Sequence, residues 1–167
     1  MRAGEFEIQL YWPAKDGFVS VALLFGSAVG PFTARLMDWV FEAGFCDEAM
    51  RDQDWVSYPL IPTEPEELSE YDAICASVEA LTTSLTKAEL LQEALERRCL
   101  VAPVNTVADV AASEQLAARE YWREVERSDH SAGGSVRHPG PFAKLSASPI
   151  AYRRPAPAAG EHSSEVL

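Results

Sequence analysis

Three histidines and three cysteines are the side chains of this 167-residue chain best suited to acid–base, metal-binding or nucleophilic chemistry. The histidines are His130, His138 and His162, and none forms the H-x-x-x-H or H-E-x-x-H pattern that places zinc ligands on one helix face. Glu161 precedes His162 and could orient its imidazole, but adjacent side chains usually point apart. The sequence therefore predicts no metal site, and a loop histidine is the simpler interpretation of His162.

The cysteines, Cys46, Cys75 and Cys99, lie far apart and form no C-x-x-C pair. None has a neighbouring His or Lys pattern that would lower the thiol pKa and activate it as a nucleophile. An odd number of cysteines without an export signal favours reduced thiols in the cytosol. Cys75 falls in an apolar helical stripe, which predicts a small residue of the core.

The segment "FGSAVG", residues 25–30, has two glycines, as phosphate-binding loops do. It lacks the Lys-Ser/Thr pair and the G-x-G-x-x-G spacing of such loops, so a turn from a strand into a helix is favoured over a phosphate cradle. The chain has no G-x-S-x-G nucleophile elbow, and its many carboxylates fall on faces expected to be solvated, where nothing raises their pKa. We accordingly assign no catalytic, cofactor-binding or metal-binding residue.

The composition is typical of a globular protein, with 47% apolar and 24% charged residues. A net charge of −12 argues against nucleic acid as a partner, because phosphate binding needs clustered Lys and Arg. No apolar run is long enough for a membrane helix, and no apolar segment of a secretory signal follows the first residues. These features predict a cytoplasmic protein with no membrane partner.

Two strands joined by a turn are predicted near the N-terminus. Apolar and polar residues alternate over residues 6–12, which is the period of a strand. Residues 13–17, "PAKDG", supply a turn in which Asp16-Gly17 tolerates positive φ. A nearly continuous apolar run over residues 18–24 predicts a more buried strand. The pattern indicates a β-hairpin.

Three helices are predicted next. Apolar residues recur at helical spacing over residues 31–43, and Gly44 is placed to end that helix. A long helix with one apolar face begins at about Glu66. The next helix follows Thr86, which forms a capping box with Glu89. Its predicted buried side consists of Leu90, Leu91, Ala94 and Leu95.

Arg97 and Arg98 come at the predicted end of that helix, where basic side chains complement the negative end of the helix dipole. This interpretation is favoured over ligand binding.

The C-terminal third changes character. Pro103 interrupts an apolar, strand-like run, and Thr106 with Asp109 offers another helix cap. Residues 113–119 are predicted as a short helix and residues 121–129 as a strand before a glycine-rich turn. We find no internal repeat.

The motifs from residue 101 onward resemble the C-terminal portion of the family III CoA-transferases, the CaiB/BaiF family that includes formyl-CoA transferase and α-methylacyl-CoA racemase. The family pattern is a strand ending in "aPV", a short helix with "QLaaR", a strand, and then "PGpp", "klS", "aP" and "GEHt". The corresponding elements are Ala102-Pro103-Val104, Glu114–Arg119, Pro139–Ser146, Ala156-Pro157 and Gly160–Leu167. Lys15–Leu23 resembles a strand of the family's smaller domain.

The resemblance implies an α+β fold. Residues 1–100 would be the family's small domain, with a β-hairpin, an antiparallel sheet and helices. Residues 101–167 would be an extended C-terminal segment that returns to a Rossmann-like large domain. Family members form interlocked dimers, which implies a homodimer when the protein is complete. We expect residues 101–167 to be poorly ordered or aggregation-prone when the chain is alone.

The resemblance also implies a reaction, the transfer of CoA between acyl-CoA thioesters and carboxylic acids. In the family a catalytic aspartate, or a His/Asp pair in the racemases, lies upstream of these motifs, as do the main CoA-binding residues and a glycine-rich loop. Nothing in this sequence corresponds to them. A CoA thioester is therefore expected as a substrate, with no tightly bound cofactor, and the chain alone is expected to be inactive.

We expect the C-terminal part of a CoA-transferase, completed by an N-terminal half or a complementary subunit. The alternatives are a fragment of a racemase-like enzyme and a noncatalytic binding or assembly module derived from the family.

Overall fold

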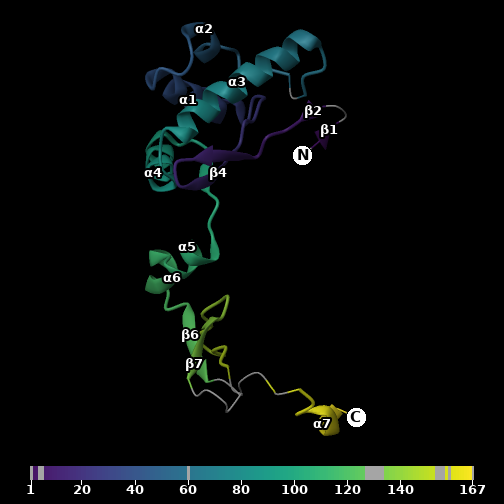
Figure 1. Cartoon of the computed structure of the whole chain (residues 1–167), viewed down its shortest axis with the longest axis vertical. Helices are drawn as coiled ribbons and strands as arrows, with labels where there is room; N and C mark the ends of the chain where they lie inside the picture. Colours follow the sequence, from purple (N-terminus) through teal and green to yellow (C-terminus); the bar gives the residue numbers. More distant parts are fainter. Residues whose placement is uncertain are drawn as a thin grey trace. The chain divides into compact units, whose positions relative to one another are not determined.

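The structure of this chain is a computed structural model that describes residues 2–3, 6–59, 61–126, 134–152, 157 and 159–166. The chain forms two compact units, residues 1–104 (unit 1) and residues 105–167 (unit 2) (Figure 1). Helices and small antiparallel sheets are mixed along the chain, which confirms the predicted α+β class. No helix in the described part of the chain is both long and apolar enough to cross a bilayer.

Unit 1 is built on a three-stranded antiparallel sheet in the order β3-β4-β5. Its strands are β3 (Tyr11–Ala14), β4 (Gly17–Val21) and β5 (Val101–Pro103). Ala14 pairs with Gly17, whose φ of 148° suits glycine, so only two residues form the turn. The predicted hairpin is therefore confirmed. Its first strand starts later than expected, because β2 (Phe6–Glu7) pairs instead with β1 (Arg2–Ala3).

Strand β4 is buried on one face only, whereas the sequence predicted nearly continuous burial. Val19 and Val21 are buried, but the Phe18 side chain between β3 and β5 is 55% exposed. The reason is that the helices of unit 1 share one core with Val19 and Val21, and no described residue of the unit buries the opposite face.

Four helices complete unit 1, namely α1 (Gly30–Glu42), α2 (Glu48–Arg51), α3 (Pro65–Thr83) and α4 (Lys87–Arg97). All three predicted helices, which are α1, α3 and α4, and the Thr86–Glu89 capping box are confirmed. Leu90 and Ala94 are buried as predicted, but Leu95 is 70% exposed, so its predicted burial was wrong. Leu95 follows Ala94 by one residue, and a 100° step along the helix turns it away from the core.

The core of unit 1 combines the inner face of the sheet with one face of each long helix. Its fully buried large side chains include Trp12, Val19, Met37, Ile74, Leu81 and Leu90. Thr33 is also fully buried, and its hydroxyl donates to the Leu24 carbonyl at 2.6 Å and accepts from the Leu24 amide at 3.0 Å. One threonine thus fixes the start of α1 against the end of the hairpin.

The hairpin turn is also tied to α4. The Asp16 carboxylate accepts a hydrogen bond from the Lys87 amide at 2.7 Å, and the Lys15 amide donates to the Leu85 carbonyl at 2.9 Å. Because helix N-terminal amides lack partners within the helix, Asp16 satisfies one of them from a distant part of the chain.

Unit 2 consists of short elements: α5 (Val107–Ala111), α6 (Glu114–Ala118), β6 (Trp122–Glu126), β7 (Ser135–Pro139) and α7 (Ser163–Val166). The predicted Thr106 cap, short helix and strand are confirmed. Strand β7 was not predicted, because all five of its residues are exposed and give no apolar alternation. Only Gly140 is buried among the described residues of this unit.

Unit 1 ends after Val104, beyond the boundary predicted at residue 100. Val101–Pro103 pair with β4, and the Val104 amide donates to the Phe18 carbonyl at 2.9 Å, which ties these residues to the hairpin. The assignment of residues 1–100 and 101–167 to two domains of a larger fold stays a prediction.

Candidate functional site

The histidines considered above are not brought into a common site by the residues that the structure describes. His138 is exposed on β7 and pairs across the ribbon with Arg123, and His162 lies just before α7. His130 lies outside the described residues. Within the described ranges, no three His, Cys, Asp or Glu side chains come together as possible metal ligands.

Burial disfavours the thiolate form of all three cysteines. Burial raises the pKa of Cys75 to about 11, although a hydrogen bond with Tyr71 acts in the opposite direction. Burial is also the main cause of the raised pKa values of Cys46 and Cys99. Cys75 is half-buried at the edge of the core rather than inside it. A thiol with a raised pKa is a poor nucleophile at neutral pH.

The glycine-containing segment 25–30 is a turn into α1, and the backbone of Trp55 lies against it. The Gly26 amide donates to the Trp55 carbonyl at 3.1 Å, and the Gly30 amide donates to the Gly26 carbonyl at 2.7 Å. A β-carbon on residue 30 would lie 2.5 Å from the Trp55 oxygen. Gly30 therefore allows a close backbone approach, and Gly26 adopts a positive φ of 101°. The amides of both glycines donate to backbone carbonyls, which uses the donors that a phosphate would need.

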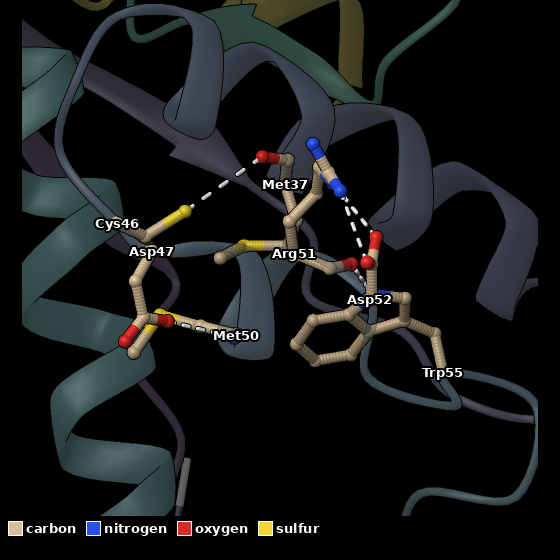
Figure 2. Close-up of polar contacts among 7 residues, drawn as sticks. All are labelled: Met37, Cys46, Asp47, Met50, Arg51, Asp52 and Trp55. Carbon is tan, nitrogen blue, oxygen red and sulfur yellow. Dashed lines mark hydrogen bonds and ion pairs between the residues drawn. The ribbon is translucent and has the colours of Figure 1, made fainter.

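Figure 2 shows the polar contacts among seven residues around α2. We call this group the α2 corner, and its members are Met37, Cys46, Asp47, Met50, Arg51, Asp52 and Trp55. Asp47 caps the helix by accepting from the Met50 amide at 2.9 Å. Cys46 lies with its sulfur 4.0 Å from the Met37 carbonyl oxygen. These contacts fix the chain as it leaves α1 and enters α2.

Arg51 is the only cation of the α2 corner, and it is fully engaged there (Figure 2). Its guanidinium donates to both Asp52 oxygens, at 2.7 and 3.0 Å, and lies 4.3 Å from the centre of the Phe41 ring. The side-chain hydrogen bond between Arg51 and Asp52 raises the pKa of Arg51 and lowers the pKa of Asp52. The Trp55 indole donates to the Arg51 carbonyl at 3.2 Å. The geometry of the corner is that of a structural clamp.

The first of two concave sites lies between α1, α3 and α4, and we call it the Trp39 pocket. Its volume is about 430 Å³. The Arg97 guanidinium contacts Glu42 at 2.6 Å and Glu93 at 3.1 Å, and lies 5.5 Å from the centre of the Trp39 ring. The other lining residues are Ala43, Phe45, Leu81, Ser84 and Leu85. Two carboxylates already surround the single cation, so the pocket suits an apolar group better than an anion.

The second concave site is a groove of about 510 Å³ along α3, which runs past Cys75 and small residues. Asp72 and Glu79 line it, and the Gln9 amide contacts Glu79 at 3.4 Å. Two carboxylates repel phosphates and carboxylic acids alike. Among the described residues that line these two cavities, no nucleophile is hydrogen-bonded to a general base.

The Trp39 pocket was not found by sequence reasoning. The helix spacing of Glu93 and Arg97 predicts their contact, but Glu42 lies 55 residues away from Arg97 in the sequence. The sequence interpretation of Arg97 as a favourable residue at the end of a helix agrees with its position but omits this long-range partner.

The sequence and the fold are both similar to known proteins. Residues 11–163 of this chain match the sequence pattern of the protein family described as CoA-transferase family III. Subunit BbsE of succinyl-CoA:(R)-benzylsuccinate CoA-transferase from Thauera aromatica is 28% identical over 93% of this chain and 36% of that protein. Formyl-CoA:oxalate CoA-transferase from Rhodopseudomonas palustris is 30% identical over 73% of this chain and 28% of that protein. The chain thus spans about a third of the length of the curated relatives it matches.

Solved structures are similar to this chain in fold. Rv3272 from Mycobacterium tuberculosis superposes with a TM-score of 0.60 at 16% identity, over 98% of this chain and 41% of that chain. A CaiB/BaiF family protein from Brucella suis superposes with a TM-score of 0.59 at 20% identity, over 93% of this chain and 35% of that chain. At these identities the similarity shows the fold alone.

Proposed function

Because the chain belongs to CoA-transferase family III, we propose that it forms the C-terminal part of an enzyme that transfers CoA from an acyl-CoA thioester to a carboxylic acid. The observation that carries the proposal is the extent of the family match, which runs from β3 in unit 1 to the start of α7 in unit 2. A match confined to one unit would support only a shared module.

The catalytic aspartate of this reaction lies in the N-terminal half or complementary subunit that completes the enzyme. A carboxylate nucleophile must be positioned and the charge of its transition state stabilised by preorganised donors. The two cavities described above supply neither a nucleophile paired with a base nor an unpaired cation among their described lining residues. Relatives about three times as long have room for such a site elsewhere.

Unit 2 returns to a Rossmann-like large domain of the complete enzyme. The two-stranded β6–β7 ribbon is marginal on its own, because ribbons of this size usually need a further strand or a helix for stability. Apolar side chains of unit 2 beyond the ribbon are available for such a contact, since Phe142 is 84% exposed and Tyr152 is 52% exposed. The complete enzyme is a cytoplasmic homodimer in this proposal.

The substrate class follows from the family and from the named relatives. One relative is named for succinyl-CoA and (R)-benzylsuccinate, and the other for formyl-CoA and oxalate. Both names pair an acyl-CoA donor with a carboxylic acid acceptor. We propose the same pair of classes here, with the CoA thioester as a substrate rather than a bound cofactor.

Co-expression with an N-terminal family III portion that carries the catalytic aspartate tests the proposal. The copurified complex is expected to transfer CoA between a set of acyl-CoA donors and carboxylic acids, as measured by mass spectrometry of the CoA esters. The 167-residue chain alone and a complex with that aspartate changed to asparagine are the controls, and both are expected to be inactive. Equal transfer by the chain alone would contradict the assignment.

Two alternatives give different results in the same experiment. A racemase-like enzyme would exchange the α-proton of a 2-methylacyl-CoA with deuterium from solvent and transfer no CoA. A noncatalytic module, which the lack of a nucleophile–base pair in the described cavities favours, would copurify with its partner and leave both reactions at background.

A further inference from the structure

The Trp39 pocket is lined by the C-terminal ends of three helices. Glu42 is the last residue of α1, Ser84 follows the last residue of α3, and Arg97 is the last residue of α4. The C-terminal end of a helix carries a partial negative charge, which stabilises cations near it. Neither α1 nor α3 has a basic residue in its last turn, so only α4 has a cation of its own there. The backbone around the pocket therefore favours a cation.

The charged side chains of the pocket also favour a cation. Glu42 places a carboxylate at the end of α1, where the helix dipole disfavours one, and Glu93 adds a second carboxylate. Arg97 is the only cation among the described lining residues, so two carboxylates and one guanidinium leave a net charge of −1. The guanidinium contacts Oε2 of each carboxylate, and Oε1 takes part in neither contact. Each carboxylate can therefore accept from a second cation.

The wall of the pocket next to these charges is apolar. Trp39 and Leu81 belong to the buried core of unit 1, and Phe45 and Leu85 are half-buried against it. The Arg97 guanidinium lies 5.5 Å from the centre of the Trp39 ring, a distance at which a cation and an aromatic ring attract each other. The volume of about 430 Å³ is within the range of sites for small molecules.

A small molecule is favoured over a protein as the occupant of the Trp39 pocket. Interfaces between proteins have a core of large apolar side chains. None of the large apolar side chains that are exposed in the described part of unit 1 lines this pocket. Its exposed lining residues are Glu42 and Ala43, a charged residue and a small one. A concave apolar wall with a charged rim is typical of a site for a small ligand.

We propose that the Trp39 pocket binds a small organic cation, which consists of an ammonium group on an apolar body. The ammonium group donates to Glu42 and Glu93, and the apolar body packs against Trp39 and Leu85. Both substrates of the proposed reaction are anions, which these carboxylates repel, so the cation is a further ligand. The site uses only residues of unit 1 and does not depend on the proposed reaction.

Titration of the full 167-residue chain with 2-phenylethylammonium, followed by amide and indole chemical shifts, tests the site. We expect shifts at residues 39–45, 81–85 and 93–97, with a dissociation constant of about 1 mM for a ligand of this size. The anion 3-phenylpropionate has the same aromatic body and is expected to bind about tenfold more weakly, because the two carboxylates repel it. Ammonium chloride lacks the apolar body and is expected to leave these residues unshifted.

Variants of the carboxylates test the assigned contacts. Glu42→Gln is expected to raise the dissociation constant of 2-phenylethylammonium about threefold, as the loss of one exposed ion pair does. Glu96→Gln is the matched control, because Glu96 is an exposed glutamate of α4 that does not line the pocket, and its change alters the net charge equally. Combining Glu42→Gln with Glu93→Gln leaves Arg97 without a carboxylate in the pocket and should reverse the preference toward 3-phenylpropionate. Unchanged amide shifts in the β3-β4-β5 sheet show that a variant is folded.

Several results would overturn the proposal. They are equal binding of the cation and the anion, an equal loss in the Glu96→Gln control, and shifts that follow the groove along α3 with Asp72 and Glu79 instead of the pocket. The absence of any shift would do the same. So would loss of cation binding in the complex with an N-terminal family III portion, because that result assigns the pocket to the other portion.

Discussion

The backbone of Gly140 lies against the carbonyl group of Tyr121, so that a β-carbon on residue 140 would overlap the Tyr121 oxygen. This approach joins the end of β7 to the residue that precedes β6 and gives unit 2 its single buried position among the described residues. The glycine is thus required by space rather than by a positive φ.

Gly140→Ala is expected to separate the Tyr121 end of the β6–β7 ribbon. A backbone oxygen cannot move aside as a flexible side chain can, so the methyl group should displace the strand end. Amide chemical shifts of residues 122–126 and 135–139 measure the change. Ser148→Ala, a change of an exposed side chain in the same unit, is the comparison and should perturb fewer amides. Equal spectra for the two variants would contradict the close approach.

Thr33→Val is expected to lower the free energy of unfolding of unit 1 by about 1–3 kcal/mol, because the Leu24 amide and carbonyl lose their buried partner. Thr33→Ser keeps the hydroxyl and is expected to retain most of that free energy. Urea unfolding followed by tryptophan fluorescence measures both variants. A Val variant as stable as the wild type would show that the Leu24 groups find other partners.

Leu90→Ala and Leu95→Lys are expected to differ widely although both residues lie in α4. Leu90 is fully buried, so its truncation should cost about 2–5 kcal/mol, whereas Leu95 is 70% exposed and its change should stay within about 0.5 kcal/mol. Thermal and urea unfolding provide the measurements. Strong destabilisation of the monomeric Leu95→Lys protein would show that Leu95 is buried, as the sequence predicted.

The contrast between these two leucines shows what sequence reasoning can and cannot reach. The Thr86–Glu89 cap and the hairpin depend on neighbours within a few residues, so their residue types predict them. The exposure of Leu95 depends on which side of α4 meets the sheet. Leu90, Leu91, Ala94 and Leu95 span a wide part of the helix surface, and their spacing leaves that side undetermined.

The candidate site was less predictable than the fold for the same reason. Arg97 of α4 meets Glu42 and the Trp39 ring of α1 across a long sequence separation, and no local pattern encodes that contact. Strand β7 was missed because its residues have no buried face of their own. The motifs in the C-terminal third were informative in a different way. They predicted the family, which the comparisons confirm, although few contacts within this chain depend on them.

Tyr58 is expected to make unit 1 sensitive to alkali. Burial, followed by the nearby Glu70 and Glu67, raises the pKa of Tyr58 from 10.0 to about 12. Between these values the unfolded chain loses the proton and the folded chain keeps it, so the contribution of Tyr58 to stability is complete below pH 10 and is lost as pH rises toward 12. Tyr71 and Cys75 also have raised pKa values and add to the loss.

Tyr58→Phe should make this alkaline loss of stability smaller while leaving neutral stability unchanged or improved. The Tyr58 hydroxyl has no hydrogen-bond partner among the described residues, so its removal leaves no group unsatisfied there. Urea midpoints measured from neutral pH upward provide the comparison. Identical pH profiles for variant and wild type would rule out Tyr58 as a contributor.

Amide hydrogen exchange should distinguish the two units in the isolated chain. Slow exchange is expected in α3, whose buried face includes Ile74 and Val78, and in the Val101 amide region that pairs with β4. Fast exchange is expected from residue 105 onward, where Gly140 is the only described residue that is buried. Strong protection across unit 2 in a monomer would show that it needs no partner to be stable.

The bond from the Lys87 amide to Asp16 has a consequence for how the molecule comes together. It joins residues 71 positions apart, so the start of α4 gains this partner only after the hairpin and the three intervening helices have come together. Contacts of such large sequence separation slow the search for the native state. We therefore expect Asp16→Ala to accelerate unfolding more than it delays refolding, because the bond forms late on the route to the native structure.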